Sequence, residues 1–153
     1  MLLLDVLEHL PDDRGVMRAV HAALAGRPDP FVLFTVPAFR QLWSPWDDLE
    51  KHKRRYTLGE ARALAADAGF EIARASYFFF PLFFAAAAVK GLRVARAALA
   101  GPPPPPRFDR LTEARNNAAL NRVMLRLLAP ERRWLARRPL PLGTSIFVLA
   151  RPR

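Results

Sequence analysis

Apolar residues in the first half of the chain alternate between short continuous runs and helically spaced positions. The apolar run Leu2–Leu4 makes residues 2–6 read as the end of a buried strand, and the apolar residues 31–36 predict a second one. Residues 70–78, with the β-branched Ile72 among them, predict a third strand. Between them, apolar positions recur at helical spacing after capping residues, Asp12 or Asp13 in the first case and Thr57 in the second. Strand, helix and strand within so short a length predict βαβ crossovers, so the chain is predicted to be an α/β protein with parallel strands.

The third predicted strand leads into an uncharged stretch, residues 77–89, that is too short to span a membrane as a helix. Lys90, Arg93 and Arg96 follow at three-residue spacing and indicate that the helix goes on. We expect this helix to cover the sheet or to form a lid over a pocket. A helix lying on a membrane surface is the alternative.

The second half of the chain is predicted to be helical before a final strand. A polyproline spacer at residues 102–106 precedes an amphipathic helix expected over 112–129, which Pro130 ends or kinks, and residues 144–150 read as a terminal strand. These elements predict one domain over residues 1–153, with a βαβαβ core at 1–80, a helical lid or insertion at 81–138 and a last strand within 139–153.

The formal charge of +10 changes this picture little, because the basic residues are scattered along the chain. Lys51, Lys53 and Lys90 are the three lysines among 24 basic residues, an arginine bias that looks compositional. No nucleic-acid-binding signature accompanies it, so nucleic acid is not an expected partner. The absence of cysteine excludes thiolate chemistry, and the start of the chain has no signal-peptide pattern, so a cytoplasmic location is expected.

Side chains able to bind a ligand gather after the second predicted strand. His52, Arg54, Arg55 and Tyr56 are candidates for binding an anionic or hydroxylated molecule, the arginines through bidentate contacts. Trp43 is a candidate wall of an apolar pocket. The alternative is an ordered surface turn whose aromatic residues fill the core. No cluster has the sequence spacing of metal ligands, so no metal is predicted.

The order of several short motifs resembles the C-terminal half of class I S-adenosylmethionine-dependent methyltransferases, and more narrowly the methyltransferase type 11 and type 23 domain group. The motifs are D-V-L-E-H-L-P-D-D from Asp5, T-V-P from Thr35, L-W-S from Leu42, H-K-R-R-Y-T from His52 and A-G-F from Ala68. This resemblance implies a partial Rossmann-like sheet. Residues 2–6, 31–36 and 71–78 would be its parallel fourth, fifth and sixth strands, and 144–150 an antiparallel seventh strand between the fifth and the sixth.

The resemblance also implies where the cofactor and the acceptor lie. Asp5, Val6 and Leu7 would lie beside the methionine end of S-adenosylmethionine, and the loop at 37–56 would face the acceptor substrate. Glu8 and His9 are placed where a general base could act, or else they shape the turn and cap neighbouring amides. The acceptor is expected to be a small molecule or a lipid-linked one, with peripheral membrane contact as part of the second case.

The first three strands of such a domain, with their glycine-rich turn, have no counterpart in this sequence, where no G-x-G-x-G occurs. We therefore expect a truncated methyltransferase domain that binds S-adenosylmethionine poorly unless a complementing N-terminal half is supplied. The alternative is a non-catalytic remnant or interaction module. The strand at residues 2–6 would then be an open apolar sheet edge, able to pair with that half or with a second copy.

Overall fold

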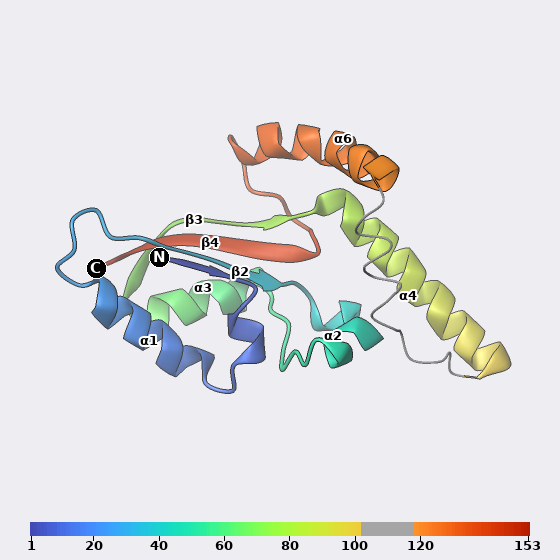
Figure 1. The fold of residues 1–153 in the computed structure, drawn as a ribbon, viewed down its shortest axis with the longest axis horizontal. Helices are drawn as coiled ribbons and strands as arrows, with labels where there is room; N and C mark the ends of the chain where they lie inside the picture. Colours follow the sequence, from blue (N-terminus) through green and yellow to red (C-terminus); the bar gives the residue numbers. More distant parts are fainter. Residues whose placement is uncertain (102–117) are drawn as a thin grey trace.

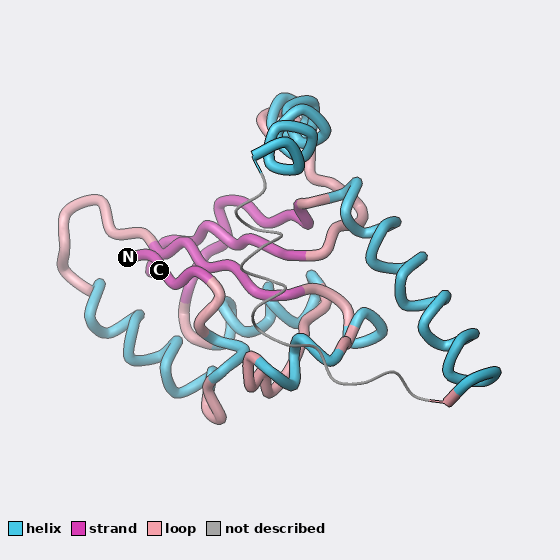
Figure 2. The backbone as a smooth tube through the Cα atoms, turned by 45° about the vertical axis from the view of Figure 1, so that its right-hand side comes forward, coloured by secondary structure: helices cyan, strands magenta, loops and turns pink. Residues whose placement is uncertain are grey.

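The computed structural model describes residues 1–101 and 118–153, and it shows a mixed four-stranded sheet with helices on both of its faces (Figures 1 and 2). The elements, in chain order, are β1 (Leu2–Leu4), the 3-10 turn η1 (Leu7–His9), α1 (Asp13–Leu24), β2 (Val32–Pro37), the 3-10 turn η2 (Arg40–Leu42), α2 (Pro45–Leu49), α3 (Leu58–Asp67), β3 (Phe70–Phe78), α4 (Phe80–Ala100), α6 (Ala118–Leu135) and β4 (Ser145–Pro152).

The strand order is β1-β2-β4-β3. β1 pairs with β2 in parallel, and β4 runs antiparallel between β2 and β3. The predicted α/β class and the antiparallel terminal strand between its two neighbours are confirmed. The numbering of these strands within a larger methyltransferase sheet stays a prediction. Because β1 is at the sheet edge, Leu2 and Leu4 are 59% and 54% exposed.

The main core lies between the sheet and the helices α1 and α3, on the lower side in Figure 1. Alternate residues of β2 and β4 face it and are fully buried, among them Phe34 and Val148. Helix α1 begins at Asp12, whose side chain accepts a hydrogen bond from the Gly15 amide, and α3 begins with the predicted capping box of Thr57 and Glu60.

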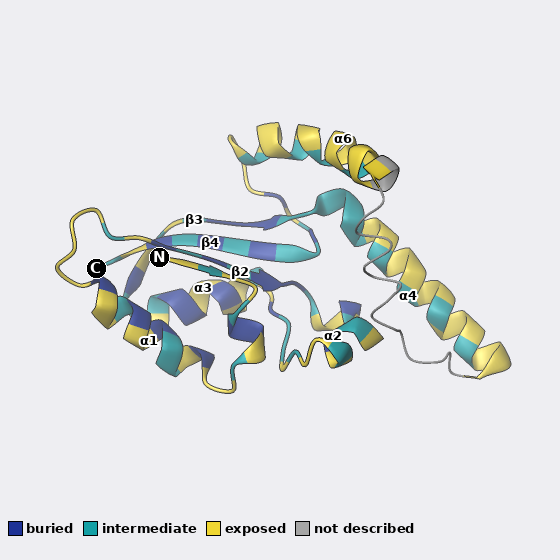
Figure 3. Ribbon diagram, in the orientation of Figure 1, coloured by how far each residue is buried: buried dark blue, intermediate teal, exposed yellow. Residues whose placement is uncertain are grey.

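The opposite face of the sheet is covered by α6, and α4 extends away from the sheet (Figures 1 and 3). Helix α6 continues past Pro130 to Leu135. Of the two predicted effects of this proline, ending the helix is therefore wrong. The exposed position of Pro130 lets water reach the carbonyl that the missing amide leaves unpaired. The predicted start of this helix, and the polyproline spacer, lie outside the described residues.

Helix α4 begins at Phe79, a residue in the left-handed region with φ 62° and no side-chain cap of its own. Glu131 of α6 replaces that cap, because its carboxylate accepts hydrogen bonds from the amides of Phe79 (2.6 Å) and Phe80 (2.8 Å). Gly143, before β4, packs so closely on Phe78 that a Cβ would collide with the Phe78 backbone. Among the described residues, no helix is long and apolar enough to cross a membrane.

Candidate functional site

The chain segments that follow β1 and β2 meet at one edge of the sheet, since parallel strands end on the same side. The first segment is residues 5–9, directly after β1. The second is the loop 38–56, which contains η2 and α2 and returns to pair Ala38 with Tyr56. A backbone hydrogen bond of 2.7 Å from the amide of Lys53 to the carbonyl of Glu8 joins the two segments. Most of the residues predicted to bind cofactor or substrate therefore lie close together.

Asp5 ends β1 earlier than predicted, because its φ of 52° leaves the extended region. Its amide donates to the Thr35 side chain (3.0 Å), and the Thr35 hydroxyl donates to the Asp5 carboxylate (3.0 Å). The chain then turns inward, so that Leu7 is fully buried in the core and Val6 is half-buried, while Asp5 stays exposed. Of the three residues predicted to contact the cofactor, Leu7 packs its side chain in the core.

Glu8 is buried, with 1% of its surface exposed, and His9 beside it is exposed. Burial raises the pKa of Glu8 to about 7, and the negative charge of Asp5 adds to the shift, while a backbone amide hydrogen bond and His52 oppose it. Within the described part of the chain, the Glu8 Oε2 atom has no hydrogen-bond partner. A carboxyl group with a pKa near neutrality can exchange a proton with a bound molecule, which is the chemistry a general base requires.

Asp47 is the buried centre of the loop that follows β2, and sequence reasoning assigned it no role. Arg55 donates to both of its carboxylate oxygens, at 2.7 and 3.0 Å, and His52 Nδ1 lies 2.9 Å from its Oδ1. Burial opposes ionisation, yet these hydrogen bonds from Arg55 and His52 and that from the Ser44 amide hold the pKa of Asp47 below its usual value. The capping box of Ser44 and Asp47 at the start of α2 was the available sequence signal.

Arg54 and Tyr56 are joined to a second buried carboxylate, that of Asp13 in α1. The Tyr56 hydroxyl donates to Asp13 at 2.8 Å, and Arg54 lies 3.0 Å from the other oxygen. Burial, followed by the Asp13 contact, raises the pKa of Tyr56 above its ordinary value. Tyr56 is only 5% exposed, so its side chain contacts the core and not the solvent. The alternative in which this tyrosine packs inside an ordered turn matches that placement.

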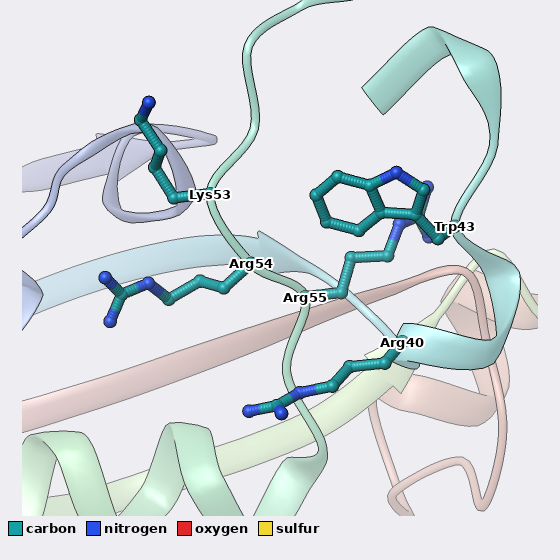
Figure 4. A pocket seen from close by; sticks show the side chains of 5 residues that line it. All are labelled: Arg40, Trp43, Lys53, Arg54 and Arg55. Carbon is teal, nitrogen blue, oxygen red and sulfur yellow. The ribbon is translucent and has the colours of Figure 1, made fainter. Parts of the chain in front are cut away.

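A cationic pocket of about 430 Å³ opens within the loop 38–56 (Figure 4). Its lining residues are Arg40, Trp43, Lys53, Arg54 and Arg55. Trp43 forms one wall, held by a hydrogen bond from its Nε1 to Asp48 (3.0 Å). Among the described residues, Lys53 is the cation of this pocket whose side chain has no ion pair, since the three arginines each pair with a carboxylate. The pocket thus combines one unpaired ammonium group with an aromatic wall.

Three predicted residues meet beside this pocket. Possible ligand atoms of Glu8, His9 and His52 all lie within 4.8 Å of one another. His9 and His52 are separated by 42 residues in the sequence, so a search for closely spaced metal ligands does not find this cluster, and the sequence predicted no metal.

The phenylalanines of the segment predicted to cover the sheet or to form a lid lie in two different places. Phe78 and Phe79 line a second cavity of about 650 Å³, which lies between the sheet and α6. Phe83 instead packs edge-on against Phe39, with ring centroids 5.5 Å apart, and Phe84 is 54% exposed. None of these phenylalanines lines the cationic pocket, so the proposed lid over an acceptor stays a prediction.

Comparison with known proteins yields neither a matching family model nor a matching curated protein. The chain is similar to solved structures of phosphoethanolamine N-methyltransferase 2 from Haemonchus contortus. One of these is a complex with S-adenosyl-L-methionine (14% identity, TM-score 0.47), and another is a complex with phosphomonomethylethanolamine and S-adenosylhomocysteine (12% identity, TM-score 0.46). Each match covers 99% of this chain and 33% of the other, so the chain spans about a third of their length.

Proposed function

We propose that this chain is the acceptor-side portion of an S-adenosylmethionine-dependent methyltransferase. The observation that carries the proposal is the meeting of D-V-L-E-H, residues 5–9, with the loop 38–56 at the carboxyl ends of two parallel strands. Open α/β sheets bind ligands at that edge. The terminal strand, antiparallel between its neighbours, is the arrangement that the motif resemblance implies, and the strands correspond to the fourth to seventh of the family sheet.

In this proposal, the chain positions the acceptor and the methionine end of the cofactor. Methyl transfer is an in-line displacement, so positioning supplies much of the rate enhancement, and a base is needed only for a protonated acceptor. Asp5 and Val6 contact the methionine end, and Glu8 or His9 takes the acceptor proton. Lys53 and Trp43 bind an acceptor that has an anionic group and an apolar part.

The acceptor is a small molecule or a lipid-linked one, and the exposed surface of α4 favours the second. Leu92, Val94 and Leu99 are 63%, 63% and 89% exposed on a helix that contains no acidic residue. Lys90, Arg93 and Arg96 add positive charge, and each cation near an anionic bilayer contributes about 1 kcal/mol of attraction. In this proposal the protein is cytoplasmic, and the exposed apolar side chains and the cations of α4 support peripheral membrane contact.

The test has two parts. The DNA upstream of Met1 is read for an in-frame glycine-rich strand and turn, and the chain is titrated with S-adenosylmethionine by calorimetry, alone and with any such segment included. We expect weak binding alone and saturable binding with the segment, the latter weakened at least about tenfold by Asp5→Ala. Failure of the extended protein to bind S-adenosylmethionine would refute the methyltransferase proposal.

A second candidate, a non-catalytic interaction module, is favoured by the exposure of Leu2 and Leu4 on the edge strand β1. An apolar edge with unpaired backbone groups is a template for another strand. In light scattering at micromolar concentration, the parent chain should associate, whereas Leu4→Lys should be largely monomeric. A monodisperse parent monomer would argue against this module.

A further inference from the structure

Glu8 carries a buried oxygen atom without a partner, and its carboxylate lies beside the imidazoles of His9 and His52. The residue is 1% exposed, and its Oε2 receives no hydrogen bond from the described part of the chain. A buried carboxylate oxygen without a hydrogen-bond partner is unfavourable, and a bound cation would remove that cost. The ring of His9 stands edge-on to that of His52, with centroids 4.7 Å apart, and possible ligand atoms of both rings lie within 4.8 Å of a carboxylate oxygen of Glu8.

His52 is oriented as a metal-binding histidine is. Its Nδ1 lies 2.9 Å from Asp47 Oδ1, which fixes the proton on Nδ1 and leaves the Nε2 lone pair free when the ring is neutral. Asp47 is itself held by Arg55. A carboxylate that orients an imidazole whose other nitrogen binds a metal is the usual outer arrangement of such sites.

A fourth oxygen lies on the solvent side of the cluster. The carboxylate of Glu50 is 3.2 Å from His52 Nε2, and its side chain is 48% exposed. Without a metal, a protonated His52 between Asp47 and Glu50 explains the same two contacts. The protonated ring, however, leaves the Glu8 oxygen unpartnered and gives no role to the approach of His9.

We propose that Glu8, His9 and His52 form a binding site for a divalent transition-metal ion, with Glu50 as a fourth ligand. Two imidazoles and carboxylates suit Zn²⁺ and its neighbours in the first transition series, whereas Mg²⁺ and Ca²⁺ prefer oxygen ligands alone. Atoms that bind one Zn²⁺ tetrahedrally are about 3.4 Å apart, so ligand atoms that now lie within 4.8 Å of one another need to close by at most about 1.4 Å. The site borders the cationic pocket through Lys53, but metal binding does not depend on methyl transfer.

The experiment uses the untagged chain, because a polyhistidine tag would bind the same ions. Zn²⁺ is titrated by calorimetry into chelator-treated protein, and Co²⁺ is added to a second sample to record its ligand-field absorption. We expect one Zn²⁺ per chain, a rise in melting temperature with Zn²⁺, and the intense visible bands of four-coordinate Co²⁺. The absence of saturable Zn²⁺ binding would overturn the proposal.

Three variants assign the ligands. His9→Ala and Glu8→Gln should each weaken Zn²⁺ binding by at least about tenfold, and Glu50→Gln should weaken it less. His21→Gln, which removes an imidazole of α1 outside the cluster, is the matched control and should bind Zn²⁺ like the parent. Each variant is first melted without metal, so that a misfolded protein is recognised. Equal Zn²⁺ affinity in His9→Ala, Glu8→Gln and the parent would place the ion elsewhere and overturn the assignment.

Discussion

Arg55 donates one hydrogen bond to each carboxylate oxygen of Asp47, 2.7 and 3.0 Å long. Asp47 is 1% exposed. A third donor, His52, approaches the same carboxylate at 2.9 Å. Bidentate pairs of this kind are stronger and more directional than single contacts. The loop that carries the candidate site is therefore built around an acid that no ligand is expected to touch.

Replacing Asp47 by Asn should destabilise the protein by about 3–5 kcal/mol, because it leaves the buried guanidinium of Arg55 without its counter-charge. Equilibrium urea unfolding measures this loss. Asp48→Asn is the matched control, since Asp48 is exposed and its side chain accepts a hydrogen bond from the Trp43 indole. Similar losses for the two variants would show that the Asp47 pair adds no stability beyond that of a surface acid.

The stability of the metal-free protein should fall as pH rises toward neutrality, because of Glu8. Its pKa is about 7 in the folded chain against 4.5 as the ordinary value, so folding favours the protonated form. The stabilisation from protonated Glu8 is complete below pH 4.5, declines as pH rises above that value and is lost once pH passes about 7. The free energy of unfolding should fall by about 3 kcal/mol over this range.

Glu8→Gln should remove this pH dependence and be more stable than the parent at pH 8. Melting temperatures between pH 5 and pH 8, recorded with chelator present, provide the measurement. Glu71→Gln, at an exposed position of β3, should follow the parent curve. A Glu8→Gln curve that parallels the parent would mean that Glu8 is ionised in the fold at little cost.

The main elements follow from the sequence because they depend on local signals. Periodic apolar positions and the capping box at Thr57 are properties of a few neighbouring residues, and they predicted the strands and α3 correctly. The burial of Glu8 and its approach to His52 arise from packing between segments more than 40 residues apart. Arg54 and Arg55 looked free in the sequence, because the fold alone shows that Arg54 pairs with Asp13 and that the loop folds back to pair Arg55 with Asp47.

Removing the Glu131 side chain should loosen the start of α4. Its carboxylate accepts from the amides of Phe79 and Phe80, so Glu131→Ala should cost about 1–2 kcal/mol, as the loss of a helix cap does. Limited trypsin digestion should then cut faster after Lys90, Arg93 and Arg96. Trp134→Ala, at an exposed position of the same helix, is the control. Unchanged cleavage rates would show that α4 does not depend on this cap.

Membrane contact through α4 predicts that Leu92→Ser combined with Leu99→Ser reduces binding to anionic vesicles. Both leucines are exposed, whereas Phe83 packs on Phe39 and is a poorer choice for the test. Co-sedimentation at low salt should show a loss of about tenfold, because two apolar side chains no longer enter the bilayer surface. Leu2→Ser with Leu4→Ser is the control, with exposed leucines on β1. Equal sedimentation of the parent and the α4 variant would remove the membrane proposal.

The pairing of Arg54 with Asp13 and of Arg55 with Asp47 sets up a competition inside the cationic pocket. An anion that drew either guanidinium outward would leave a carboxylate stranded in the interior, so binding by that route would work against folding. Ligands that leave both arginines in place and interact with Lys53 and the face of Trp43 should therefore bind best. We expect this pocket to exclude small, highly charged ions and to prefer molecules with one charge and an apolar body.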